Sequence, residues 1–86
     1  MKRHLILGVH VPNRVKDAPK IQALLTEYGC NIRTRLGMHD ADDTRCSPGG
    51  LLVLELVGDA TRCGQLARKL ASVRGIEVKK MAFGKP

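Results

Sequence analysis

The feature that most constrains this chain is the order in which strand-like and helix-like apolar patterns follow one another. Residues 4–11 alternate apolar and polar side chains with the period of two that is typical of a β-strand. Residues 14–28 then carry apolar side chains at helical spacing. The pattern predicts further strands at 30–38, 51–57 and 76–83, with a second helix between the last two.

The resulting order, β-α-β-β-α-β, is that of an α+β, ferredoxin-like fold. Right-handed crossovers then place both helices on one face of a four-stranded antiparallel sheet. Residues 51–57, LLVLELV, are nearly all apolar, which is typical of a central strand. The 86 residues suffice for one domain, so we expect residues 1–86 to form a single one.

Local signals predict where the elements begin and end. Pro19 fits only the first turn of a helix, so either Asp17 caps a helix that starts directly after it or a longer helix bends at Pro19. Gly29 is expected to end this helix as a left-handed cap, and Asp59 to cap the second helix. The polar stretch 39–50 ends in Pro-Gly-Gly and is expected to be a loop.

A sheet with both helices on one side leaves its other face without a cover. Because residues 51–57 carry apolar side chains in both phases, that face is predicted to be apolar. A small domain with only 2% aromatic residues commonly gains stability by association. We therefore expect a homodimer or homotetramer that forms through sheet faces or edges.

The net charge of +7 favours anionic partners, which include small metabolites, acidic proteins and nucleic acid. The basic residues are scattered, with no run of like charge and no interleaved aromatic residues, which disfavours nucleic-acid binding. Three cysteines at unequal spacing indicate free thiols in a reducing compartment. With no signal-peptide pattern and no long apolar span, the chain is expected to be cytoplasmic and not in a membrane.

The richest candidate site is the second strand and what flanks it. If the apolar residues of that strand face the helices, Arg33 and Arg35 face outward together and can bind one anion, with Arg14 and His39 nearby. An equally weighted alternative is that both arginines pair with Glu55, in this chain or in another copy. In the first strand, Gly8 indicates either a close approach by a ligand or backbone, or a small residue beneath a helix.

An alternative is a transition-metal site. His39 and Cys46 carry imidazole and thiolate ligands suited to zinc, copper or nickel, with Cys30 and His10 as further ligands. Cys30 and Cys63 also fall at apolar positions, which favours burial as small hydrophobic side chains. Without this alternative, no cofactor is expected.

The sequence gives little support to catalysis. It contains no Gly-rich phosphate loop and no arrangement of serine, histidine and acid that resembles a triad. Cys46 and Ser47 near His39 lack a third, orienting group. We therefore expect a protein that is not an enzyme.

The chain resembles the small ACT-like proteins called iron-only hydrogenase system regulators in LGVHVPNRVKDAPKIQALLTEYGC, IRTRLGMHD, CSPGGLLVLEL and GIEVKKMAF. The resemblance spans almost the whole chain and is most specific in YGCNIRTRLGMH. It implies an ACT-like fold, oligomers formed through the sheets and a role in transcriptional regulation. Pro19 departs from the uninterrupted helix expected of that family.

The chain is also similar, less closely, to the C-terminal sensing domain of nickel-responsive repressors. That similarity implies metal ligands at His39 and Cys46. Gly37 and residues 27–29 stand where that family has its other histidines, and Met1 lies almost at the first strand, so no DNA-binding segment is expected before it.

Together these observations predict a homo-oligomeric module that senses a small anionic or amino-acid-like effector. Its expected role is that of a transcription-related regulator without its own DNA-binding domain, which could act with a partner protein. The alternatives are a metal-responsive protein that uses His39 and Cys46, and a nucleic-acid-binding protein.

Overall fold

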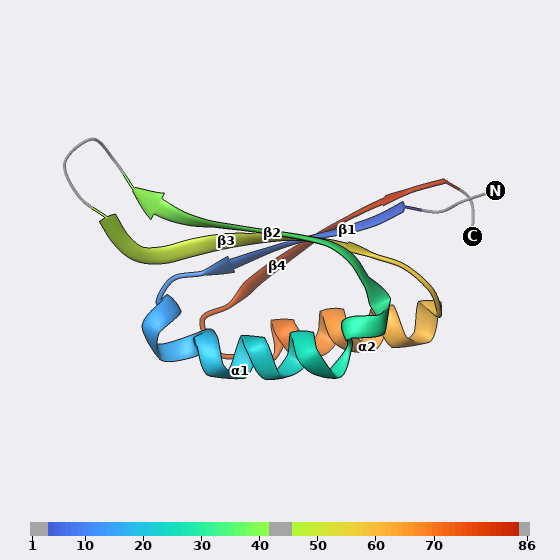
Figure 1. The fold of residues 1–86 in the computed structure, drawn as a ribbon, viewed down its shortest axis with the longest axis horizontal. Coiled ribbons are helices and arrows are strands. Elements are labelled where there is room, and N and C mark those ends of the chain that lie inside the picture. The colour runs from blue at the N-terminus through green and yellow to red at the C-terminus, as the bar shows by residue number, and fades with distance from the viewer. Residues whose placement is uncertain (1–3, 42–45, 85–86) are drawn as a thin grey trace.

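Four strands form one antiparallel sheet, and two helices cover one of its faces (Figure 1). The structure, a computed structural model, describes residues 4–41 and 46–84, without the side chains of residues 14, 15, 39–41 and 46–48. The sheet order is β2-β3-β1-β4, which confirms the ferredoxin-like α+β fold and the central position of the strand that contains residues 51–57. The elements are β1 (His4–Val11), α1 (Arg14–Glu27), η1 (Gly29–Asn31), β2 (Ile32–Ala41), β3 (Cys46–Leu56), α2 (Ala60–Ala71) and β4 (Glu77–Phe83).

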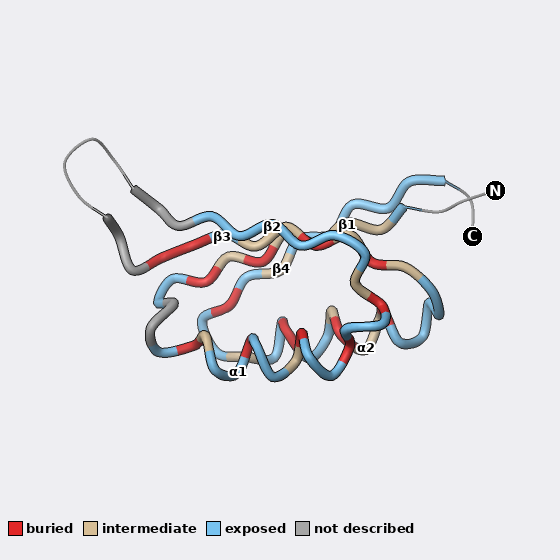
Figure 2. Tube along the Cα trace, viewed as in Figure 1, coloured by how far each residue is buried: buried red, intermediate tan, exposed pale blue. Residues whose placement is uncertain are grey.

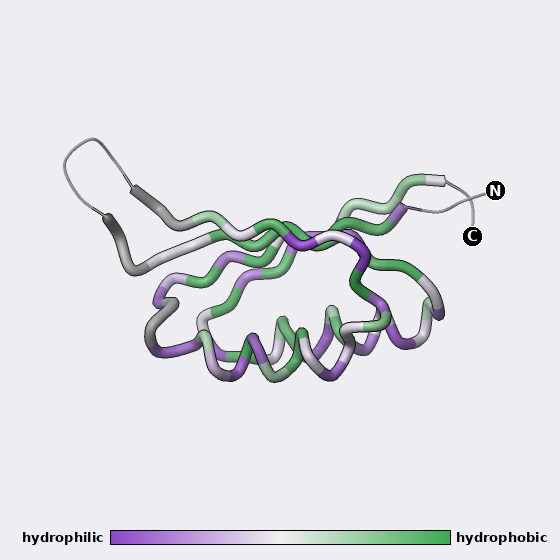
Figure 3. Tube along the Cα trace, viewed as in Figure 1, coloured by the Kyte–Doolittle hydropathy of each residue, from purple (hydrophilic) through white to green (hydrophobic). Residues whose placement is uncertain are grey.

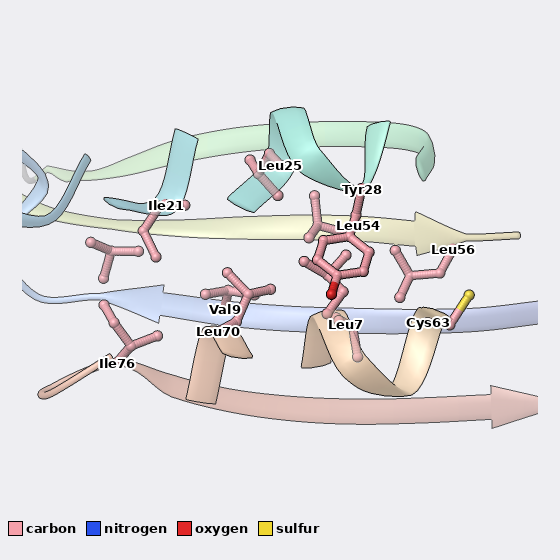
Figure 4. Close-up of a cluster of buried hydrophobic side chains, with 12 residues drawn as sticks. Leu7, Val9, Ile21, Leu25, Tyr28, Leu54, Leu56, Cys63, Leu70 and Ile76 are labelled. Atoms are coloured by element: carbon pink, nitrogen blue, oxygen red, sulfur yellow. The ribbon is translucent and has the colours of Figure 1, made fainter. Parts of the chain in front are cut away.

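The hydrophobic core lies between the sheet and the helices (Figure 2, Figure 4). Leu7 and Val9 of β1 and Leu54 of β3 are fully buried, and each such side chain contributes about 1.5–3 kcal/mol of burial free energy. The alternation predicted for residues 4–11 is thereby confirmed. The other core residues are Val11, Ile21, Leu25, Tyr28, Leu56, Cys63, Leu66, Leu70 and Ile76. Among the described residues, no helix is long and apolar enough to cross a membrane.

Tyr28, at the end of α1, joins the two helices. Its ring is 1% exposed and lies under the Arg62 guanidinium, 4.4 Å from the ring centroid, and the Lys69 ammonium, at 5.2 Å. Lys69 Nζ also lies 3.1 Å from Glu27 Oε2. The Tyr28 side chain first, and Glu27 second, hold the pKa of Lys69 above its ordinary value. The basic residues of this helical surface therefore stabilise the contact between α1 and α2.

The start of α1 settles the question that Pro19 raised. Asn13 caps the helix, because its side-chain oxygen accepts a hydrogen bond from the Lys16 backbone N–H at 3.1 Å. The helix then runs through Pro19 to Glu27, so the alternative in which Asp17 caps a shorter helix is wrong. In α2 the predicted cap is confirmed, since Asp59 accepts from the Thr61 N–H at 2.8 Å.

The end of α1 differs from the prediction. Gly29 has no left-handed backbone, because the described glycines with positive φ are Gly58, Gly75 and Gly84. Instead the short helix η1 follows directly. Cys30 lies in η1 and is exposed, so its predicted place on a strand and in the core is wrong, whereas Cys63 is buried as predicted.

The predicted loop at 39–50 is wrong for its described part. β2 continues to Ala41, and β3 begins at Cys46, so the two strands form a long hairpin arm (Figure 1). Pairing with β1 ends at Gly50, so residues 46–49 have a neighbouring strand on one side only. A proline at position 48 is compatible with such an edge segment, which is why Pro-Gly-Gly does not end the strand here.

Candidate functional site

The face of the sheet opposite the helices is called the open face below. Figure 3 shows that the strands are rich in hydrophobic residues, and the register assigns part of them to this face. Residues directly opposite each other on paired antiparallel strands share a face, so the register defines this surface. Its residues are His4, Ile6, Gly8, His10, Thr34, Leu36, Met38, Leu51, Val53, Glu55, Glu77, Lys79, Met81 and Phe83.

The open face collects the exposed large hydrophobic side chains of the described chain. They are Leu36, Met38, Leu51, Met81 and Phe83, with exposed fractions between 37% and 55%. They come from β2, β3 and β4, so the apolar area extends across the sheet. Concentrated exposed hydrophobic area of this kind marks an interaction surface rather than a solvent-facing one.

The open face does not share the basic character of the whole chain. It carries two carboxylates, Glu55 and Glu77, and one lysine, Lys79, whose Nζ lies 3.7 Å from Glu77 Oε2. The net charge of +7 therefore resides mainly elsewhere. A second copy of the chain could approach this face without strong like-charge repulsion, whereas nucleic acid would find little positive potential on it.

A β-bulge at Arg33 sets the orientation of β2. Ile32 pairs with Leu56, but Thr34 already pairs with Glu55, so Arg33 is an extra residue on β2. The strand's alternation is shifted from this point onward.

The bulge overturns the predicted arrangement of the two arginines. Leu36 and Met38 lie on the open face instead of facing the helices. Arg35 lies opposite Leu54, a buried core residue, and so belongs to the helix-facing side of the sheet. Arg33 and Arg35 therefore do not form an anion-binding pair on one face.

Within the described residues, the hydrogen bonds of Glu55 go to His4 and Thr34, and not to the two arginines. His4 Nδ1 lies 3.1 Å from Glu55 Oε2, and the Thr34 hydroxyl donates to Oε1 at 3.2 Å. The hydrogen bond with His4 is the largest cause that holds the pKa of Glu55 below its ordinary value, and Thr34 and the charge of Arg33 add to it. Desolvation acts in the opposite direction but is outweighed.

Gly8 lies on the open face between Val53 and Lys79, not beneath a helix. A Cβ added there would meet no atom within 4 Å. The glycine therefore leaves a small gap in the middle of the open face, where a neighbouring molecule could approach the backbone closely.

A pocket, called the hairpin pocket below, lies where α1 begins and the hairpin arm leaves the sheet. It encloses about 310 Å³ and is lined by Ile21 and Gln22 of α1, by Gly37 of β2, and by Gly50 and Leu52 of β3, among others. A Cβ at Gly37 would lie 3.3 Å from the Leu52 side chain. Gly37 thus lets the Leu52 side chain pack closely against the backbone of β2 at the wall of the pocket.

Arg33 and Arg35, which were predicted to bind a ligand, are not among the residues that line the hairpin pocket. Arg35 shares the helix-facing side of β2 with Gly37, two residues further along. His39 pairs with the pocket residue Gly50, and Arg14 is the first residue of α1. The side chains of Arg14 and His39 lie outside the described residues, so their predicted role stays a prediction.

The metal alternative rests on side chains that are also outside the description. His39 and Cys46 both belong to the hairpin arm, where Ala41 pairs with Cys46. Within the residues that are described, no group of three or more histidine, cysteine or acidic side chains could hold a metal ion. The metal site therefore remains a prediction for His39 and Cys46.

The hairpin pocket itself was not predicted from the sequence. The available signal was the pair of glycines, Gly37 and Gly50, which fall on the same side of two neighbouring strands. The sequence pattern predicts a loop at Gly50, and only the strand register places the two glycines on one side.

Comparisons with known proteins support the fold. No family model matches the sequence, and no curated protein matches it. An uncharacterised protein from Thermotoga maritima, TM1266, has a similar structure, with a TM-score of 0.80, 24% identity, and coverage of 96% of this chain and 100% of that one. The ACT domain of a GTP pyrophosphokinase from Chlorobium tepidum matches with a TM-score of 0.66, 19% identity, and coverage of 91% and 96%.

A third similar structure is CPII, a nitrogen regulatory PII-like protein from Thiomonas intermedia, bound to ADP, AMP and bicarbonate. Its TM-score is 0.60 at 10% identity, and the match covers 99% of this chain and 97% of that one. At these identities the comparisons show that the chain has an ACT-like, ferredoxin-like fold.

Proposed function

We propose that this chain is a homo-oligomeric regulatory module that senses a small effector in the hairpin pocket and is not an enzyme. A second copy of the chain covers the open face. The observation that carries the proposal is that Met38 and Leu51 belong both to the open face and to the lining of the hairpin pocket. Their side chains point to the open face, so a ligand in the pocket contacts the strand segments that carry them and thereby changes the surface that the second copy contacts.

The coupling between ligand and oligomer follows from mass action. An effector that binds the associated form better than the single chain shifts the population toward the associated form. The +7 charge and Arg35 near the pocket favour an anionic group on the effector, and the apolar lining with Gln22 favours a small body, as in an amino acid. Arg14 and His39 are the further candidate ligand contacts.

The regulatory role draws on two supports of different kinds. The solved structures that resemble this chain include an ACT domain of a GTP pyrophosphokinase and a nitrogen regulatory protein. The sequence itself resembles iron-only hydrogenase system regulators, which makes transcription-related regulation through a partner protein the more specific form of the proposal.

Sedimentation velocity of the full chain tests the association. We expect a dimer or tetramer for the wild type and a shift toward monomer in Leu36→Glu, which places a charge within the apolar area. Ala23→Glu, on the exposed side of α1, adds the same charge away from the open face and should leave the oligomer unchanged. A wild-type monomer at all concentrations would contradict the proposal.

The effector is tested by thermal unfolding in a panel of amino acids and small carboxylates. A ligand present at 100 times its dissociation constant stabilises the folded protein by about 2.7 kcal/mol, which is readily seen as a shift in Tm. The shift should be lost in Arg35→Gln and kept in Arg74→Gln, an exposed arginine beyond α2. If no compound shifts the Tm, or if both variants show an equal shift, the proposed effector site is wrong.

A further inference from the structure

A second pocket is lined by the first residues of α2. Figure 1 shows that α2 begins at the end of the helix layer away from the start of α1. It encloses about 220 Å³, and its walls include Leu5 of β1 and Leu56 of β3. The hollow exists because α2 presents Ala60, Gly64 and Ala67 to it, three small residues at helical spacing. We call it the α2 pocket.

Gly64 is unfavourable in a helix interior by about 1 kcal/mol relative to alanine. The space around it would admit a side chain, since an added Cβ would meet only the end of the Arg68 side chain, at 3.4 Å. Packing therefore does not require glycine at this position, and what glycine preserves is the volume of the pocket.

Two cationic side chains, Arg68 of α2 and Lys80 of β4, also line the pocket. Lys80 lies opposite the buried Leu7, so it belongs to the helix-facing side of the sheet, toward α2. No ion pair joins either cation to an acidic side chain of the described residues. Two unneutralised cations that meet at one pocket favour an anion there.

The lysines next in sequence to these two cations differ from them, because each has a carboxylate partner. Lys69 Nζ lies 3.1 Å from Glu27, and Lys79 Nζ lies 3.7 Å from Glu77. Each neighbouring lysine thus has a carboxylate partner inside the chain. Arg68 and Lys80 have no such carboxylate partner among the described residues.

The other polar groups at the α2 pocket are already engaged. Asp59, the acidic residue next to it in sequence, accepts the capping hydrogen bond from Thr61. The Cys63 thiol, which is 3% exposed, donates to the Val57 carbonyl oxygen at 3.4 Å. What the pocket offers a ligand is therefore an apolar wall and two cations.

We propose that the α2 pocket binds a small aliphatic carboxylate. The carboxylate accepts hydrogen bonds from the Arg68 guanidinium and the Lys80 ammonium, and the aliphatic part packs on Leu5, Leu56 and Ala67. Both parts are needed, because a bare inorganic anion would leave the apolar wall wet and an uncharged ligand would leave both cations without a partner. This site is separate from the hairpin pocket and does not depend on self-association.

The test titrates the full ¹⁵N-labelled chain with 4-methylpentanoate and follows its amide signals by NMR. We expect the signals of Gly58, Gly64 and Ala67 to move. Lys80→Gln and Arg68→Gln should each weaken binding about tenfold, the effect expected for the loss of one charge-assisted hydrogen bond. Lys79→Gln removes the same charge one residue away, on the open face, and should not change the affinity.

Two further probes separate the parts of the proposal. The uncharged 4-methylpentanamide should bind more weakly, and inorganic phosphate should not compete at equal concentration. In a second readout, bound 4-methylpentanoate should slow alkylation of Cys63, which lines the pocket, but not of the exposed Cys30. No signal change at these glycines, equal loss in Lys79→Gln and Lys80→Gln, or equal binding of phosphate would overturn the proposal.

Discussion

The two faces of the sheet carry similar apolar residues, but those residues differ in how far they are buried. On β3, Leu54 is fully buried beneath the helices, whereas Leu51, on the open face, is 37% exposed. Leu36 of β2 is as apolar as either and is 55% exposed. Apolar composition therefore does not decide which face becomes the core of the single chain. The helices decide it, and the open face is left with hydrophobic area that only another molecule can cover.

The largest expected effect is the difference between Leu54→Ala and Leu36→Ala, the same truncation on the two faces. Leu54→Ala leaves a cavity in the core and should lower the free energy of unfolding by about 2–5 kcal/mol. Leu36→Ala removes a side chain that is already exposed in the single chain, so it should cost less than about 1 kcal/mol under conditions where the chain is monomeric. Urea unfolding at low protein concentration measures both.

The variants Leu54→Ala and Leu36→Ala also test whether a second copy of the chain packs on the open face. If a second copy packs on it, the loss in Leu36→Ala should grow with protein concentration, because association then adds to stability. The loss in Leu54→Ala should change little. Equal losses for both variants at every concentration would show that the open face is not an association surface.

A smaller effect on the free energy of unfolding is expected when Gly58 or Gly8 is replaced by alanine. Gly58 has a φ of +88°, and a Cβ there would lie 3.1 Å from Asn31 Nδ2, so Gly58→Ala should destabilise the chain by about 1–2 kcal/mol. Gly8→Ala meets no atom within 4 Å and has an ordinary strand backbone, so it should be neutral or stabilise by about 0.5–1 kcal/mol. Thermal unfolding of the two variants gives the comparison.

The outcome at Gly8 also tests what approaches the open face. A stabilised monomer with weakened association would mean that the backbone of another copy comes close at this gap. If Gly8→Ala instead destabilises the monomer, then the open face is packed more tightly within one chain than the structure shows.

Where the alternation of a strand is unbroken, the sequence correctly predicted which of its side chains face the helices. In β1, Leu7 and Val9 are buried as their phase required. In β2 the prediction failed, because one extra residue at Arg33 exchanges the faces of all that follow, and a bulge has no reliable signature in a single sequence.

The exchange of faces on β2 is also the reason why the predicted arrangement of the two arginines was wrong. With the faces of β2 reversed, Arg35 moved to the helix-facing side next to Gly37, and the expected arginine pair on the open face was lost. The expectation that the free face is apolar held, because it rested on residues 51–57, whose register with β1 is regular. A pocket lined by Gly37 and Gly50 depends on cross-strand register, which the sequence pattern left undetermined.

The smallest expected effect is a change in the pKa of the Glu55 carboxyl, which lies on the open face. His4→Ala removes the largest cause of its lowering, so the pKa should rise toward its ordinary value, and Thr34→Ala should raise it less. Because the pKa of Glu55 is lowered in the folded chain, the stability that this group adds is present at neutral pH and is lost as the pH falls through the lowered pKa. An NMR titration of the carboxyl carbon at low protein concentration measures the shift.

Raising the protein concentration then distinguishes a wet open face from a covered one. A second copy that packs on the face removes water from Glu55, and desolvation raises the pKa of a carboxyl group. The pKa of Glu55 should therefore increase with concentration in the wild type and stay constant in Leu36→Glu, in which association is weakened. A concentration-independent pKa in the wild type would mean that Glu55 stays in water, and that a second copy, if it binds, does so through a sheet edge rather than through this face.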